Sequence, residues 1–217
     1  MQSHTLLGLA ALLALTAGCY GNATSPFPPG LAPAGDNVAA YPAAEGDEAY
    51  PEKFTLVTGS NDSYSWANLK GYIHAPIADV WAALQDPDVV VDRRNVDAWT
   101  AQRDVEPDYD VSFMVSETVY DLITIEFQVT WREGTVARSA AAPSTVIAVY
   151  QKTWGSTVID AMTGSVLLKR IDGGTTAVET IEHLSAVMSA DDSVASYQPD
   201  LFNSLKARVH GAPLPTY

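Results

Sequence analysis

Residues 73–87, IHAPIADVWAALQDP, contain the change from a strand to a helix that decides the fold. The stretch opens on the end of an apolar segment, 66–74, that predicts a β-strand. Pro76 then stands where a first helical residue is favoured, because its missing N–H would have no partner there anyway. The Asp-Pro pair at the end stops the helix, and a second short helical piece is expected over 88–95. Four apolar residues have the spacing of one helical face: Ile77, Val80, Trp81 and Leu84.

Downstream, the pattern changes to the alternation of apolar and polar residues that is typical of half-buried antiparallel strands. In the clearest case, 122–131, one face is apolar and aromatic and the other is polar. Asp172 and the two glycines after it predict a tight hairpin, and Gly164 predicts a bend or bulge in the strand before that hairpin. The expected strands after the helices are 99–105, 111–119, 122–131, 145–153, 157–171 and 175–187.

The last periodic segment, 191–210, predicts a long amphipathic helix. Gly211 suits the position just after a helix end. Pro199 conflicts with a regular helix interior, so the helix is either kinked at this residue or begins there. The apolar stripe consists of Val194, Tyr197, Leu201, Leu205 and Val209.

Three motifs in this order resemble the START-like, polyketide-cyclase-like (SRPBCC) superfamily. They are the strand-to-helix junction at 73–87, the DGGTTAV hairpin at 172–178 and the end of the last helix at 205–211. The resemblance spans about 64–211. It implies an α+β helix-grip fold, in which a curved antiparallel sheet of about seven strands surrounds a long C-terminal helix and two short helices follow the first strand.

The resemblance also implies an internal cavity for lipids, sterols, polyketides or other apolar ligands. The residues themselves leave two outcomes open, because an apolar sheet face and an apolar helix stripe either pack solid or enclose a pocket. His183 is a further candidate as a ligand contact or proton donor, although a histidine satisfied elsewhere or exposed is the alternative. The candidate cavity residues are Phe113, Phe127, Trp131, Tyr150, Leu168, His183, Leu201 and Leu205.

The N-terminal residues 1–18 have the apolar run and the following small residues of an export signal, and LTAGC at 15–19 resembles a bacterial lipobox. The resemblance implies cleavage before Cys19 and lipidation of that cysteine. Tyr20 follows in place of the Asp that retains some lipoproteins in the inner membrane, which favours the outer membrane. The alternative is an ordinary secretory signal with a chance cysteine.

Residues 19–52 are rich in Pro, Ala and Gly and have no helical or alternating pattern. We expect a disordered or extended linker, or alternatively an irregular arm that packs on the domain. The domain itself is expected over 53–211, followed by a short tail, 212–217.

Composition excludes several classes of function. The chain has 217 residues, 12 Lys and Arg, 26 Asp and Glu, and a formal net charge of −14. A nucleic-acid partner is therefore not expected, because phosphate requires a basic surface. With one cysteine there is no internal disulfide and no thiolate metal site. We find no catalytic, metal or cofactor motif, and Arg93 and Arg94 either clamp a ligand carboxylate or neutralise nearby acids.

These observations predict a lipid-anchored module of the bacterial cell envelope, at the outer membrane and facing the periplasm, that binds or carries a hydrophobic small molecule or lipid. Two alternatives stay open. One is a cyclase- or aromatase-like enzyme for a polyketide-like substrate, which would need positioned acid and base groups. The other is a structural envelope lipoprotein with a filled core. The oligomeric state is left open.

Overall fold

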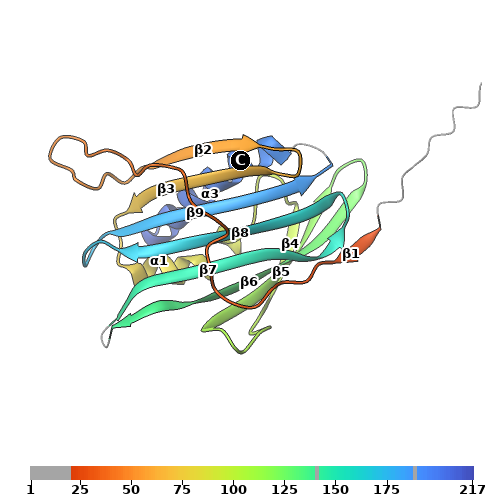
Figure 1. Ribbon diagram of the computed structural model, residues 1–217, viewed down its shortest axis with the longest axis horizontal. Coiled ribbons are helices and arrows are strands. Elements are labelled where there is room, and N and C mark those ends of the chain that lie inside the picture. The colour runs from red at the N-terminus through yellow and green to blue at the C-terminus, as the bar shows by residue number, and fades with distance from the viewer. Residues whose placement is uncertain (1–20, 140–141, 188–189) are drawn as a thin grey trace, which may run out of the picture.

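The computed structural model describes residues 21–139, 142–187 and 190–217. These residues form one antiparallel sheet with three helices on one face (Figure 1). The strands are β1 (Asn22–Thr24), β2 (Phe54–Ser60), β3 (Ser65–Ile73), β4 (Ala98–Arg103), β5 (Val111–Tyr120), β6 (Thr124–Ser139), β7 (Ala142–Ser156), β8 (Ile159–Arg170) and β9 (Thr176–Ala186). The helices are α1 (Ile77–Leu84), α2 (Pro87–Val90) and α3 (Ala190–Val209).

The strand order is β2-β3-β9-β8-β7-β6-β5-β4, with the short β1 added along β7. From β3 the chain passes through α1 and α2 to the far edge of the sheet, and it then returns strand by strand until β9 lies against β3. The long helix α3 crosses the sheet face and packs on β2, β3 and β9 and on both short helices. This is the helix-grip arrangement that the sequence predicts, with nine strands in the described part instead of about seven.

The short helices follow the local sequence rules. In α1, Ile77, Val80 and Leu84 are buried and Trp81 is partly buried, as the spacing predicts. The second helix ends at Val90, earlier than the predicted 88–95. The carboxylate of Asp92 accepts hydrogen bonds from the Arg94 N–H at 3.2 Å and the Asn95 side chain at 2.7 Å, and this replaces the helix by a turn.

Gly164 has a different role from the predicted bend. The irregularity in β8 lies between Ile159 and Ala161, while the register through Gly164 is regular. The ring of Tyr150 stands directly over Gly164, and a Cβ atom at that position would lie 2.2 Å from Tyr150 Cζ. Glycine is therefore required by the close approach of an aromatic ring.

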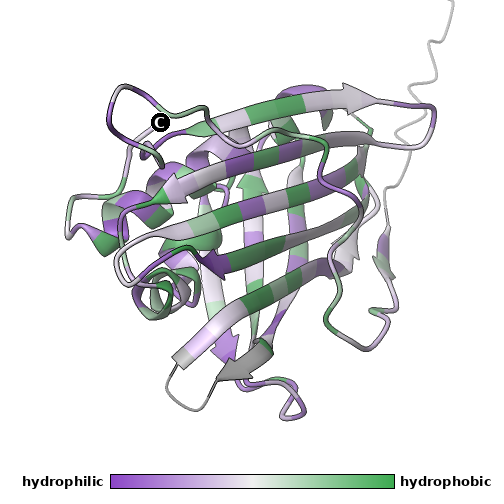
Figure 2. Ribbon diagram, turned by 60° about the vertical axis from the view of Figure 1, so that its left-hand side comes forward, coloured by the Kyte–Doolittle hydropathy of each residue, from purple (hydrophilic) through white to green (hydrophobic). Residues whose placement is uncertain are grey.

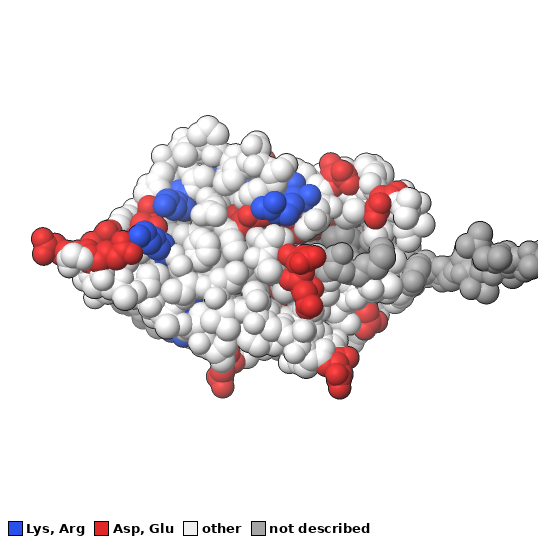
Figure 3. Space-filling view, turned by 90° about the horizontal axis from the view of Figure 1, so that it is seen from above, with Lys and Arg blue, Asp and Glu red and all other residues white. Residues whose placement is uncertain are grey.

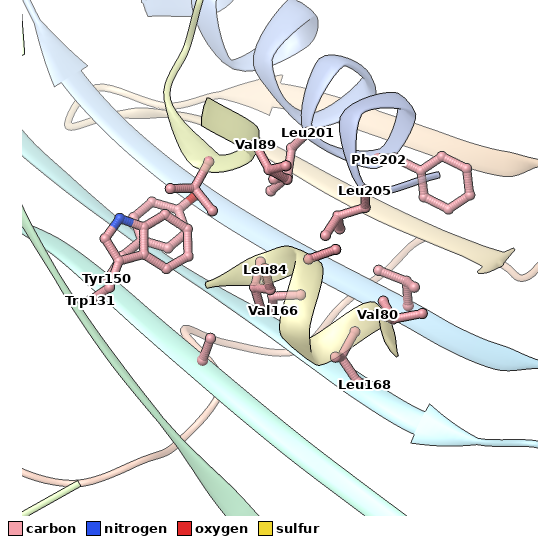
Figure 4. Close-up of a cluster of buried hydrophobic side chains, with 14 of the residues drawn as sticks. Val80, Leu84, Val89, Trp131, Tyr150, Val166, Leu168, Leu201, Phe202 and Leu205 are labelled. Atoms are coloured by element: carbon pink, nitrogen blue, oxygen red, sulfur yellow. The ribbon is translucent and has the colours of Figure 1, made fainter. Parts of the chain in front are cut away.

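The last helix is continuous through Pro199, so the prediction of a helix start at this residue is wrong. Pro199 has no N–H to donate to the preceding turn, which weakens the helix at its middle. The second half of α3 is held by apolar contacts. Leu201, Phe202 and Leu205 extend from it towards α1 and the sheet (Figure 4).

The segment before β2 is the packed arm, one of the two alternatives that the sequence leaves open. It runs across the sheet face opposite the helices (Figure 1). Asn37 donates from Nδ2 to two strand carbonyls, those of Leu69 at 3.0 Å and Thr180 at 2.9 Å. The Arg132 guanidinium donates to the Pro28 carbonyl at 2.7 Å. The arm therefore covers polar groups on a face that would otherwise be solvated.

Hydrophobic and hydrophilic residues alternate along parts of the strands (Figure 2). On the surface seen in Figure 3, acidic side chains stand out at several places and basic side chains form small groups. No helix in the described ranges combines the length and the apolar character needed to cross a bilayer.

Candidate functional site

A pocket lies between the sheet and the first half of α3. Its free volume is about 40 Å³, which is room for a few water molecules. Strands β5 to β9, the turn after α2 and the start of α3 all contribute to it. The lining residues are Val90, Asp92, Glu117, Val129, Trp131, Tyr150, Met162, Glu182, Leu184, Ser193 and Tyr197.

Two of the predicted cavity residues, Trp131 and Tyr150, form an aromatic wall of this pocket. Their rings stack with centroids 4.3 Å apart, and Phe113 stacks on the other side of Trp131 at 5.8 Å. The pair lies to one side of the helix contacts in Figure 4. Because both side chains are almost fully buried, the wall is set by packing before any ligand arrives.

The other predicted apolar residues belong to the core. They lie in the buried apolar cluster that also contains residues of α1 and of the second half of α3. Within the described residues they do not line the pocket. They are Phe113, Phe127, Leu168, Leu201 and Leu205.

His183 lies outside the pocket, which corrects the prediction that it lines the cavity. Its neighbours Glu182 and Leu184 face the pocket, so strand alternation turns His183 to the opposite face. There its ring lies 4.6 Å from that of Tyr64. Burial lowers the pKa of His183, so the neutral ring is favoured.

Two glutamates of the pocket were not found by sequence reasoning. Glu117 on β5 is 7% exposed, and the described residues offer it no hydrogen bond or ion pair. Burial, with a smaller contribution in the same direction from the charges of Asp92 and Glu182, raises its pKa to about 8. The available signal was the position of Glu117 between Val115 and Val119, on the inward face of an alternating strand.

Glu182 on β9 belongs to a small polar network. The side-chain amide of Gln198 donates to Glu182 Oε2 at 3.0 Å and to the Tyr150 hydroxyl at 3.3 Å. Burial raises the pKa of Glu182 to about 8, although the hydrogen bond from Gln198 acts in the opposite direction. The Oε1 atom of Gln198 is buried and has no partner among the described atoms.

The remaining polar groups complete the electrostatics of the pocket. Burial raises the pKa of Asp92, against the lowering effect of its hydrogen bonds from Asn95 and Arg94. The Tyr197 hydroxyl donates to the Val90 carbonyl at 2.8 Å. Burial holds the pKa of Tyr150 and Tyr197 well above the ordinary value, so both phenols are neutral. At neutral pH the pocket therefore presents largely protonated glutamates beside neutral phenols.

Arg93 and Arg94 bind α3 and the C-terminal residues, and the ion pair of Arg94 agrees with the alternative in which these arginines neutralise nearby acids. The Arg94 guanidinium forms an ion pair with Asp200 at 2.9 Å and lies 4.3 Å from the ring centre of Tyr217. Arg93 donates to the Pro215 carbonyl at 2.8 Å. The described chain holds no group of three or more His, Cys, Asp or Glu arranged to bind a metal ion. Cys19 and the predicted signal, residues 1–18, lie outside the described residues.

No protein-family model matches the chain, and no curated protein matches it. Solved structures do match. The Thermus thermophilus protein TTHA0849 has a TM-score of 0.50 at 11% identity, over 67% of this chain and 97% of that one. The fold is the helix-grip fold.

Two further structures with lower TM-scores are similar to the chain. The Zhui aromatase/cyclase from Streptomyces sp. R1128 has a TM-score of 0.44 at 11% identity, over 73% of this chain and 93% of that one. The lipid transfer and protein localization domain of human StarD13 has a TM-score of 0.49 at 11% identity, over 77% of this chain and 87% of that one. At these identities the similarity concerns the fold, and the function must be argued from the site.

Proposed function

We propose that the chain is a membrane-anchored, extracytoplasmic module that binds a hydrophobic small molecule between its sheet and the first half of α3. The observation that carries this proposal is the pocket itself. Its walls are apolar and aromatic, and a few polar groups converge on it from separate elements. This combination is typical of sites that bury the body of a ligand and orient it through a small number of polar contacts.

A ligand larger than a few waters requires the pocket to widen, and α3 provides a place for this movement. Before Pro199 the helix carries exposed Asp191 and Asp192, and its buried side chains are Val194, Tyr197 and Gln198. After Pro199 it is fixed by Leu201 and Leu205 in the core. Because a helical hydrogen bond is missing at Pro199, α3 bends most easily at this residue. The first half of α3 moves outward and the second half stays in place.

The anchor in this proposal is lipidated Cys19, which places the chain in the bacterial cell envelope, at the outer membrane and facing the periplasm. Strand β1 begins at Asn22, so two residues, Tyr20 and Gly21, separate it from Cys19, and the three residue steps between Cys19 and Asn22 span at most about 10 Å. The turn between β5 and β6 lies at the same end of the molecule (Figure 1). In that turn Leu122 is 97% exposed and Ile123 is 49% exposed. Apolar residues at the anchored end support an orientation with this end against the lipid surface.

One observation favours a second candidate function. Glu117, Glu182 and Asp92 converge on one pocket beside Tyr150. A carboxyl group whose pKa is near neutral serves as a proton donor or acceptor. A cyclase- or aromatase-like enzyme that positions a small molecule between these groups is therefore the alternative to a binding module.

Binding is tested with Nile red, a neutral apolar fluorophore, and the purified chain. We expect saturable binding under conditions in which the protein stays folded. Ser193 lines the pocket from the first turn of α3, so Ser193→Trp fills it and abolishes binding. Ser196 lies on the same helix outside the lining, so Ser196→Trp is the matched control and retains binding. Equal binding by both variants would exclude this pocket, and absence of saturable binding would leave a structural lipoprotein.

Anchoring has a separate test. In a bacterial host, Cys19→Ser is expected to move the chain from the membrane fraction to the soluble fraction. An unchanged membrane fraction would contradict lipidation at this residue.

A further inference from the structure

The ionisable side chains that line the pocket are all acidic. Three lining residues carry carboxyl groups, Asp92, Glu117 and Glu182, and the lining contains no Lys, Arg or His. The basic groups nearby are engaged elsewhere. Arg94 is paired with Asp200 at 2.9 Å, and the ammonium of Lys152 donates to the Ile159 carbonyl at 2.6 Å. The pocket therefore has an excess of acidic groups that the described chain does not neutralise.

Of the three carboxyl groups, that of Glu117 has the fewest hydrogen-bond partners. Asp92 accepts hydrogen bonds from the turn in which it lies, and Glu182 accepts one from Gln198. Glu117 is more than nine-tenths buried and has no hydrogen bond or ion pair within the described residues. Its oxygens are not among the fully enclosed atoms without a partner, so they reach the free space of the pocket. A carboxyl group that finds no partner in the surrounding protein points to a partner that enters this space from outside.

The rest of the pocket fits an organic cation. Trp131 and Tyr150 are stacked aromatic rings, and aromatic faces attract ammonium groups most strongly where water is excluded. Met162, Leu184 and Val129 provide apolar contacts for the body of a ligand. A neutral ligand would gain from these walls, but it would bring no positive charge to stabilise the ionised form of the carboxyl groups.

We infer that the ligand of this pocket is a small organic cation, an amine or quaternary ammonium on an apolar body, with Glu117 as its main counter-ion. The inference rests on the proposed binding function and names the ligand class of the same site. Asp92 and Glu182 supply further negative charge. Trp131 and Tyr150 contact the cation through their ring faces.

Proton release is a consequence of this arrangement. Besides Glu117, the titratable groups that face the pocket are Asp92 and Glu182, with Tyr150 and Tyr197 as neutral phenols. Near neutral pH the glutamates are largely protonated, so a cation binds with loss of a proton from the protein. Its affinity rises by up to about tenfold per pH unit between pH 6 and 8. A neutral ligand releases no proton, and its affinity stays flat or falls.

The experiment compares benzyltrimethylammonium, whose charge is independent of pH, with its neutral carbon isostere neopentylbenzene. Binding of each to the purified full chain is measured by displacement of Nile red and by calorimetry at pH 6, 7 and 8. We expect the cation to bind at least tenfold more tightly than the isostere at pH 8, with proton release. Glu117→Gln reduces this preference by at least tenfold, and Glu182→Gln reduces it less.

Glu133→Gln is the matched control. Glu133 is also a buried glutamate whose pKa burial raises to about 8, but it lies outside the pocket lining and accepts a hydrogen bond from Trp81 at 2.6 Å. This variant keeps the full preference for the cation. Tighter or equal binding of the isostere overturns the cation assignment and leaves the binding function standing. Failure of both probes and Nile red to bind overturns both. An undiminished preference in Glu117→Gln and Glu182→Gln overturns the role of the glutamates.

Discussion

The burial of Glu117 predicts a specific dependence of stability on pH. In the unfolded chain this carboxyl titrates near its ordinary pKa of 4.5, whereas burial raises the pKa in the folded protein to about 8. Between these two values the folded state binds more protons than the unfolded state. The free energy of unfolding therefore falls as the pH rises through this window, and it is highest below the unfolded pKa.

The size of the effect follows from the two pKa values. A difference of one unit corresponds to about 1.4 kcal/mol, so Glu117 alone removes roughly 4 kcal/mol of stability between pH 5 and pH 8. Glu117→Gln keeps the shape of the side chain and removes the titration. We expect the variant to match the native chain near pH 5 and to exceed its stability by up to about 4 kcal/mol at pH 8.

Equilibrium unfolding in urea at pH 5, 6, 7 and 8 measures this difference, provided that the slope against denaturant is the same for both chains. Glu126→Gln is the control, because Glu126 lies exposed on the neighbouring strand β6. Its effect is expected to stay within about 0.5 kcal/mol at every pH. A stability difference for Glu117→Gln that is independent of pH, or that shrinks as the pH rises, would refute the reasoning.

Four other substitutions test the remaining parts of the account. Pro199→Ala restores a helical hydrogen bond and is expected to raise the free energy of unfolding by up to about 3 kcal/mol. It is also expected to slow the association of Nile red, and an unchanged association rate would contradict bending of α3 at Pro199. Gly164→Ala places a methyl group against the Tyr150 ring and is expected to lower stability by about 1–3 kcal/mol in thermal unfolding, whereas a neutral effect would show that the ring moves freely. Asn37→Ala removes two hydrogen bonds between the arm and the sheet and is expected to lower the free energy of unfolding by about 1–3 kcal/mol. The arm is also expected to become more sensitive to protease, and unchanged resistance would argue against its packing on the sheet. His183→Ala is expected to leave the affinity for Nile red unchanged, and a loss of binding would return this residue to the site.

Much of the architecture follows from local periodicity. The helix over 77–84, the strands after it and the terminal helix each contain a strong repeat of apolar residues, and their bounds agree with the structure to within a few residues except in the longer β6 and β7. The two strands before β3 were not expected. β2 contains Thr, Gly and Ser among few large apolar residues, and β1 is a three-residue strand in a Pro-rich segment. Their pairing is decided by the neighbouring strand and not by their own sequence.

The candidate site was less predictable, because a pocket forms where side chains from different elements leave the space between them unfilled. Trp131 and Tyr150 are large residues on inward faces, and so are Leu201 and Leu205, which fill the core. Size and direction do not separate the two groups. The better signal was chemical. Glu117 is an ionisable residue on an inward, apolar strand face, and burying such a group without a partner costs free energy.

Native mass spectrometry of the full chain after gentle extraction tests the central claim most directly. The account predicts that the chain carries a small organic molecule in substoichiometric or full amount, and that Ser193→Trp, which fills the pocket, releases it while Ser196→Trp keeps it. A chain that is free of any such molecule, and that takes up neither Nile red nor benzyltrimethylammonium when these are added, would contradict the claim.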